Sequence, residues 1–85
     1  MKPQAVRRLK IIEGQIRGLQ KMVEEGAYCI DIITQASAIK EALSGVEDLL
    51  LENHLSTHVI QQIKSGQEDH ATEEILKVYK LKRKK

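Results

Sequence analysis

Residues 8–35, RLKIIEGQIRGLQKMVEEGAYCIDIITQ, contain the pattern that decides the fold. Apolar residues recur at alternating spacings of four and three, which is typical of helices that pack along an apolar seam. The first seam consists of Ala5, Leu9, Ile12, Ile16, Leu19 and Val23, and the second of Ile32, Ala36, Ile39, Leu43, Val46 and Leu50. Gly26 lies between them as a helix stop. The sequence therefore predicts two long helices separated near Gly26.

The remaining residues extend this helical pattern. The second helix is expected to begin near Ala27 or Tyr28 and to continue to the break at Ser65-Gly66. A third helix is predicted over residues 68–81, with Ile75, Leu76 and Tyr79 facing inward. No segment has the pattern of a strand. We expect an all-α chain of three helices, forming one domain over residues 1–85, with 82–85 as a frayed basic tail.

Length and composition favour an oligomer. The 85 residues include no Trp, no Phe and only two Tyr, so an aliphatic core must hold a small chain together. Oligomerisation is a common remedy for so small a core. A single cysteine excludes an internal disulfide and favours a reducing compartment. Because no segment resembles a signal peptide or a membrane span, we expect a cytoplasmic protein with no membrane partner.

The net charge of +2 hides an uneven distribution. Six basic residues against three acidic ones lie in residues 1–25, and six basic residues with no acid lie in residues 77–85. Such ends favour a polyanionic partner. Part of the first group forms a stripe on the first helix, with Gly14 in its gap: Arg7, Lys10, Arg17 and Lys21. This stripe is either a solvated helix face or a surface that follows the phosphates of double-stranded DNA. The lack of aromatic platforms argues against single-stranded or RNA ligands.

One cysteine and two histidines form a candidate metal site. His54 and His58, in NHLSTH, are four residues apart and share one helix face. Together with Cys29 they form a soft, nitrogen-rich donor set that suits Cu(I), Zn(II) or Ni(II) rather than Mg or Ca. The alternatives are a buried cysteine and a solvated histidine pair. If one helix carries Cys29 and His54, they are separated by roughly 37 Å and can meet only across two chains.

An antiparallel pair of second helices would satisfy this condition. Cys29 of one chain meets His54 of another if the two helices cross near residues 40–43. Small residues, which permit close approach of two helices, cluster there: Ala36, Ala38, Ala42, Ser44 and Gly45. Such a dimer would contain two equivalent sites.

The stretch Arg8–Gln35, together with NHLSTH and Glu73-Glu74, resembles the copper-sensitive operon repressor family. That family also includes nickel/cobalt, formaldehyde and persulfide sensors, and the resemblance covers nearly the whole chain. It implies an all-helical fold without a helix-turn-helix. It also implies antiparallel dimers, each forming a four-helix bundle, that pair into homotetramers. Metal-free members bind operator DNA and leave it when the effector binds.

The resemblance also implies roles for individual residues. Cys29 and His54 match metal ligands, and His58 occupies the third ligand position, where copper members have a second cysteine. Tyr28 and Glu74 match residues that hydrogen-bond the ligands, and these contacts link the site to the fold. Arg8 matches an arginine used on DNA, beside the stripe of Arg7, Lys10, Arg17 and Lys21.

The leading hypothesis is a Cu(I)-responsive repressor of metal-resistance genes, with Ni(II), Zn(II) or Co(II) as alternative ions. Nickel/cobalt members add an N-terminal histidine, which Met1-Lys2-Pro3-Gln4 lacks. Formaldehyde members pair the cysteine with an N-terminal proline, and Pro3 lies one place off. The lack of a second cysteine excludes the two-thiol chemistry of persulfide sensors.

Two other expectations complete the hypothesis. The alternative to a repressor is a protein of another functional class, a cytoplasmic metal-binding helical module that does not bind DNA. We expect neither catalysis nor a small-molecule substrate. His70, in the presumed loop beside Glu68 and Asp69, is expected to be solvated.

Overall fold

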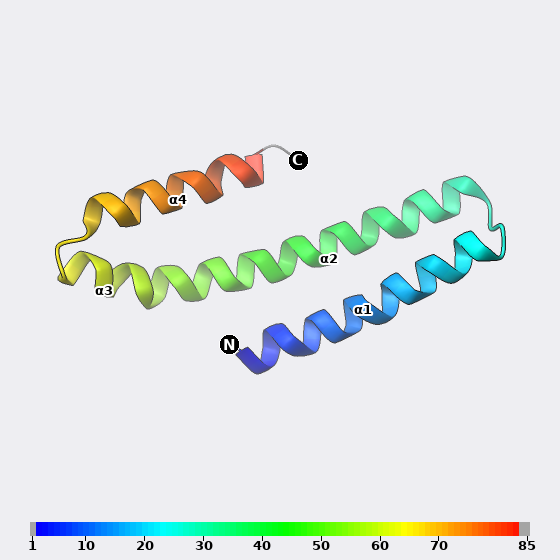
Figure 1. Cartoon of the computed structure of the whole chain (residues 1–85), viewed down its shortest axis with the longest axis horizontal. Helices are drawn as coiled ribbons and strands as arrows, with labels where there is room; N and C mark the ends of the chain where they lie inside the picture. Colours follow the sequence, from blue (N-terminus) through cyan, green and yellow to red (C-terminus); the bar gives the residue numbers. More distant parts are fainter. Residues whose placement is uncertain (1, 84–85) are drawn as a thin grey trace. The chain divides into compact units, whose positions relative to one another are not determined.

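The computed structural model describes residues 2–83, which are almost entirely helical (Figure 1). Four segments follow one another: α1 (Lys2–Glu24), α2 (Cys29–Ser56), α3 (His58–Lys64) and α4 (Glu68–Arg83). No strand occurs within residues 2–83, and the all-α prediction is confirmed. No helix in this range is long and apolar enough to span a membrane. The chain divides into two compact units, one ending at Leu51 and the other beginning at Glu52.

Two glycines end helices as the sequence predicts. Gly26 has a φ of 69°, its N–H donates to the Val23 carbonyl over 3.1 Å, and the N–H of Ala27 donates to Met22 over 2.9 Å. Gly66, with a φ of 79°, repeats the same pair of bonds after α3. This is the Schellman arrangement, which needs a left-handed residue and therefore favours glycine.

The predicted second helix is divided at Thr57, where the backbone has a φ of −126° and a ψ of −73°. Two side-chain hydroxyls compete for carbonyls in the preceding turn. Ser56 Oγ donates to Glu52 and Asn53, and Thr57 Oγ1 donates to the Asn53 carbonyl over 2.7 Å. Such bonds back to the previous turn bend helices. The stretch that the sequence predicts as one helix therefore consists of α2 and α3.

The first unit has a small aliphatic core. Ile12 of α1 is buried against Ile39 and Val46 of α2, with Leu19 and Ala42 packed around them. The apolar seams are only half covered, because other members of the same seams remain exposed: Leu9, Ile16, Val23, Leu43 and Leu50. A single chain therefore leaves much of both predicted seams facing outward.

The second unit is built by α3 packed on α4, with Val59 and Ala71 buried. Leu76 and Tyr79 are 50% and 58% exposed, so their predicted inward orientation is wrong. The face of α4 that packs inward is the one that carries Ala71. Leu76 and Tyr79 lie on another side of the helix. α4 also continues to Arg83, so Lys82 and Arg83 are helical rather than frayed. Lys84 and Lys85, the rest of the predicted tail, lie outside the described residues.

Gly26→Ala should destabilise the protein by about 1 kcal/mol, because a Cβ in the left-handed region is strained. Gly18→Ala is the matched control. Gly18 lies inside α1, a Cβ there would meet nothing within 4 Å, and alanine is the better helix former. Thermal unfolding at one fixed protein concentration should therefore give shifts of opposite sign. Equal shifts for both variants would contradict the assigned helix end.

Candidate metal centre

The histidine pair is placed as the sequence predicts. His54 lies in the last turn of α2 and His58 is the first residue of α3. Their ring centroids are 5.2 Å apart and the ring planes are tilted by 32°. His54 is half-buried and His58 is exposed. The two imidazoles are therefore neighbours, although the helix is interrupted between them.

Thr57 favours one tautomer of His58. The single hydroxyl hydrogen of Thr57 is donated to the Asn53 carbonyl, and Thr57 Oγ1 lies 3.4 Å from His58 Nδ1. A hydrogen bond across that contact requires the imidazole to donate its Nδ1–H. The lone pair of Nε2 is then free to bind a ligand.

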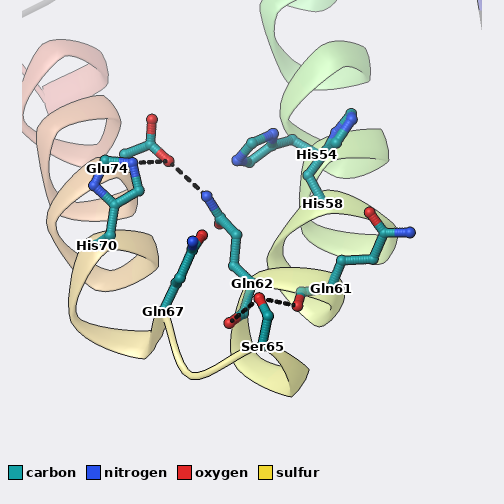
Figure 2. A pocket seen from close by; sticks show the side chains of 8 residues that line it. All are labelled: His54, His58, Gln61, Gln62, Ser65, Gln67, His70 and Glu74. Atoms are coloured by element: carbon teal, nitrogen blue, oxygen red, sulfur yellow. Dashed lines mark hydrogen bonds and ion pairs between the residues drawn. The ribbon is translucent and has the colours of Figure 1, made fainter.

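An open hollow of about 340 Å³ lies between the histidine pair and the start of α4. Figure 2 draws the side chains that line it. Glu74 accepts a hydrogen bond from Gln62 Nε2 at its Oε1 over 3.2 Å. His70 Nε2 lies 3.6 Å from the same carboxylate oxygen. The carboxylate thus lines the same hollow as His54 and His58. The contacts of Glu74 are with Gln62 and His70 rather than with a proposed ligand, so the role that the family resemblance implies for Glu74 stays a prediction.

His70 corrects one prediction. It lies in the first turn of α4 rather than in a loop. Its side chain is 61% exposed, as expected of a solvated residue, but its ring pairs with Glu74. The i, i+4 spacing of His70 and Glu74 on a helix is the sequence signal for this contact. Gln62, whose partner Glu74 lies twelve residues away on another helix, was also missed, because no local spacing marks that contact.

Cys29 is exposed and is the first residue of α2. Tyr28 precedes the helix, its carbonyl accepts from the Ile32 N–H over 3.1 Å, and its side chain is 71% exposed. Because α2 runs unbroken to Ser56, one helix carries both Cys29 and His54, as the sequence argument required. At 1.5 Å per residue they are separated by roughly 37 Å along it.

No three metal-binding side chains come together within residues 2–83 of one chain. The chain instead presents an adjacent imidazole pair and, at the far end of the helix that carries His54, one accessible thiol. One sulfur and two nitrogens are a donor set for a soft or borderline ion. The donors fit such an ion only when two chains contribute to one site.

The basic residues named for DNA are all exposed on α1: Arg7, Arg8, Lys10, Arg17 and Lys21. Arg17 Nη1 lies 3.5 Å from Glu13 Oε1, and Lys21 Nζ lies 3.8 Å from Glu25 Oε1. Both pairs are largely exposed, so each is worth at most about 1 kcal/mol and is easily exchanged for another anion.

Two further features describe this basic surface. Arg7 and Lys10 line a shallow hollow with Lys2, Pro3 and Val6. A Cβ on Gly14, in the gap of the stripe, would lie 3.6 Å from Arg17 Nη2, which is an ordinary contact. Packing within one chain therefore does not require glycine at this position.

Comparison with known proteins identifies the family. The family profile described as metal-sensitive transcriptional repressor matches residues 1–81. The copper-sensing transcriptional repressor CsoR of Bacillus subtilis is 48% identical over 79 residues, covering 93% of this chain and 78% of that protein. The copper-sensing repressor RicR of Mycobacterium tuberculosis is 47% identical over 60 residues, covering 71% of this chain and 62% of that protein.

A solved structure agrees with the sequence comparison. The crystal structure of the copper-sensing repressor CsoR with Cu(I) from Geobacillus thermodenitrificans matches with a TM-score of 0.86 and 46% identity. The match covers 93% of this chain and 82% of that chain. The predicted resemblance to the copper-sensitive operon repressors is confirmed, and the chain belongs to the metal-sensitive transcriptional repressor family.

Proposed function

We propose that this chain is a Cu(I)-responsive repressor whose metal-free form binds operator DNA. Cys29 of one chain, with His54 and His58 of another, would hold Cu(I). The observation that carries the proposal is the 5.2 Å imidazole pair, whose His54 lies on the same unbroken helix as a distant, exposed thiol. Relatives named as copper-sensing repressors support the choice of copper.

The donor set favours Cu(I) over the other ions. Cu(I) accepts thiolate and imidazole ligands at low coordination number. Structural Zn(II) sites are almost always four-coordinate, and Ni(II) or Co(II) would also need more donors than these three. When bound, the ion would supply bonds that tie one chain to another at each end of α2. Tyr28 and Glu74 would hydrogen-bond the ligands and transmit their state to the fold.

DNA binding is assigned to α1. Arg7, Lys10, Arg17 and Lys21 would follow the phosphates, with Arg8 beside them. Since metal and DNA favour different conformations, each must weaken the binding of the other by the same factor. Because the proposed partner is operator DNA, we place the protein in the cytoplasm. We assign the protein a binding role rather than catalysis, with no small-molecule substrate.

The assembly needed for this site is an antiparallel dimer that pairs into a homotetramer. The exposed seam residues of α1 and α2 offer the apolar surface. At Gly45 of α2 a Cβ would meet nothing within 4 Å in the single chain, which leaves room for a second helix. Residues 1–85 would then act as one functional domain within the tetramer.

A mixture of two defective chains tests the shared site. Cys29→Ala and His54→Ala chains should each bind Cu(I) weakly as homodimers. The hybrid dimer should regain one intact site, because Cys29 comes from one chain and both histidines from the other. Differently tagged chains, co-expressed and purified as the hybrid, should bind one tight Cu(I) per two chains by chelator competition. No tight copper in the hybrid would contradict a site between chains.

The ligand set can be tested by spectroscopy. X-ray absorption of the copper-loaded protein should report one sulfur and two nitrogen neighbours. Cys29→Ala should abolish release of DNA by Cu(I) and retain binding by the metal-free protein. His58→Cys should tighten Cu(I) binding, since Cu(I) prefers sulfur. A spectrum without sulfur, or release by Ni(II) but not Cu(I), would replace the copper assignment by nickel/cobalt.

The DNA surface can be tested by salt dependence. Arg8→Ala and Arg17→Ala should weaken binding to the DNA upstream of the protein's own gene. Each should also reduce the slope of log affinity against log salt by about one unit, as expected for a lost phosphate contact. Lys64→Ala, outside the α1 surface, is the control. Wild-type slopes in both arginine variants would place the DNA surface elsewhere, and no DNA binding at all would favour a metal-binding helical module.

A further inference from the structure

Gln62 has a polar atom that no other group satisfies. Its Nε2 donates to Glu74 Oε1 over 3.2 Å, which fixes the orientation of the carboxamide, because a carboxylate only accepts. Its Oε1 is buried and has no hydrogen-bond partner within residues 2–83. An unpaired buried acceptor costs about 1–3 kcal/mol, so its retention calls for an explanation.

The neighbours of Gln62 identify the missing donor. Figure 2 shows the Gln62 side chain between the histidine pair and Glu74, in the same hollow. The Nδ1–H of His58 already has an acceptor in Thr57 Oγ1. His54 is the more buried imidazole of the pair, and its ring nitrogens have no hydrogen-bond acceptor within residues 2–83. An imidazole that binds a metal through one nitrogen carries a proton on the other, and this N–H needs an acceptor.

We infer that Gln62 is a positioning residue that connects His54 to Glu74. Its Oε1 accepts the N–H of a metal-bound His54, and its Nε2 donates to the Glu74 carboxylate. The chain of donors and acceptors runs in one direction, from imidazole through carboxamide to carboxylate. His70, 3.6 Å from the same carboxylate oxygen, holds Glu74 from the other side. The inference rests on the proposed metal function of His54.

The bridge separates metal binding from its effect on DNA. The three proposed metal ligands do not include Gln62, so its loss should affect Cu(I) affinity less than the response. The response is the factor by which Cu(I) lowers operator affinity. This factor should depend on Gln62, because the carboxamide connects a ligand on α2 to Glu74 on α4.

The first test compares Gln62→Met with Gln61→Met. Methionine keeps the length of glutamine and removes both polar atoms, and Gln61 is an exposed neighbour whose side chain points away from Glu74 (Figure 2). For each protein, operator affinity is measured with and without Cu(I), and Cu(I) affinity by chelator competition. In Gln62→Met the response should fall at least about tenfold, and Cu(I) affinity should fall by less. In Gln61→Met the response should equal that of the wild type.

The second test exchanges the two polar groups. Gln62→Glu alone places two carboxylates together and should lose the response. Adding Glu74→Gln lets the amide at position 74 donate to the carboxylate at 62, whose other oxygen accepts from His54. The double variant should therefore recover most of the response. If Gln62 were needed only for packing, the nearly isosteric Gln62→Glu would keep the response by itself. This comparison remains decisive even if Gln62→Met does not fold.

A third readout needs no metal. In the metal-free protein the side-chain amide resonances of Gln62 should shift in Glu74→Gln, while those of Gln61 should not. A wild-type response in Gln62→Met, or unmoved Gln62 resonances, would overturn the bridge. A wild-type protein that keeps its DNA in Cu(I) would instead overturn the proposed function, and the amide shift would still report on the Gln62–Glu74 contact.

Discussion

The stiffness of α2 is the constraint on which the rest of the molecule depends. A helix rises about 1.5 Å per residue, and Cys29 and His54 are held near opposite ends of one unbroken segment. No rearrangement of side chains brings the thiol to the imidazoles within that segment. A binding site that uses both residue types must therefore form between two chains. Consistent with this, no three metal-binding side chains come together within residues 2–83 of one chain.

The packing of the chain leads to the same conclusion. Ile12, Ile39 and Val46 form a core too small to cover two long seams, and large aliphatic residues stay exposed on both helices. In the second unit α3 and α4 bury little beyond Val59 and Ala71. Apolar surface left in water favours association at about 25 cal/mol per Å² buried. The proposed ligands and the exposed apolar surface thus both favour association with further copies of the chain.

The parts of the fold that depend on local chemistry were predictable from the sequence. Gly26 and Gly66 mark helix ends because only a residue tolerant of positive φ completes the closing bonds. The division at Thr57 was not predicted, since apolar spacing continues through it and the cause is competition by hydroxyls for carbonyls. Leu76 and Tyr79 were placed on the wrong side because large apolar residues lie on more than one side of α4, so their spacing alone does not define its buried face.

Of the candidate site, the imidazole pair could be predicted from spacing. The i, i+4 spacing of His70 and Glu74 also carried a signal for their contact. The contact of Gln62 with Glu74 could not be predicted, because it depends on how α4 packs against α3.

The interruption at Thr57 gives the histidine pair a mechanical property. His54 precedes the bend and His58 follows it, so the two rings belong to segments whose relative angle is set by a few side-chain bonds. A ligand held by only one ring would leave that angle free. A ligand held by both rings spans the bend and fixes it, and α3 carries α4 with it through their packing. In the proposed function, an ion bound by both imidazoles would therefore hold the end of α2 and the start of α3 at one fixed angle.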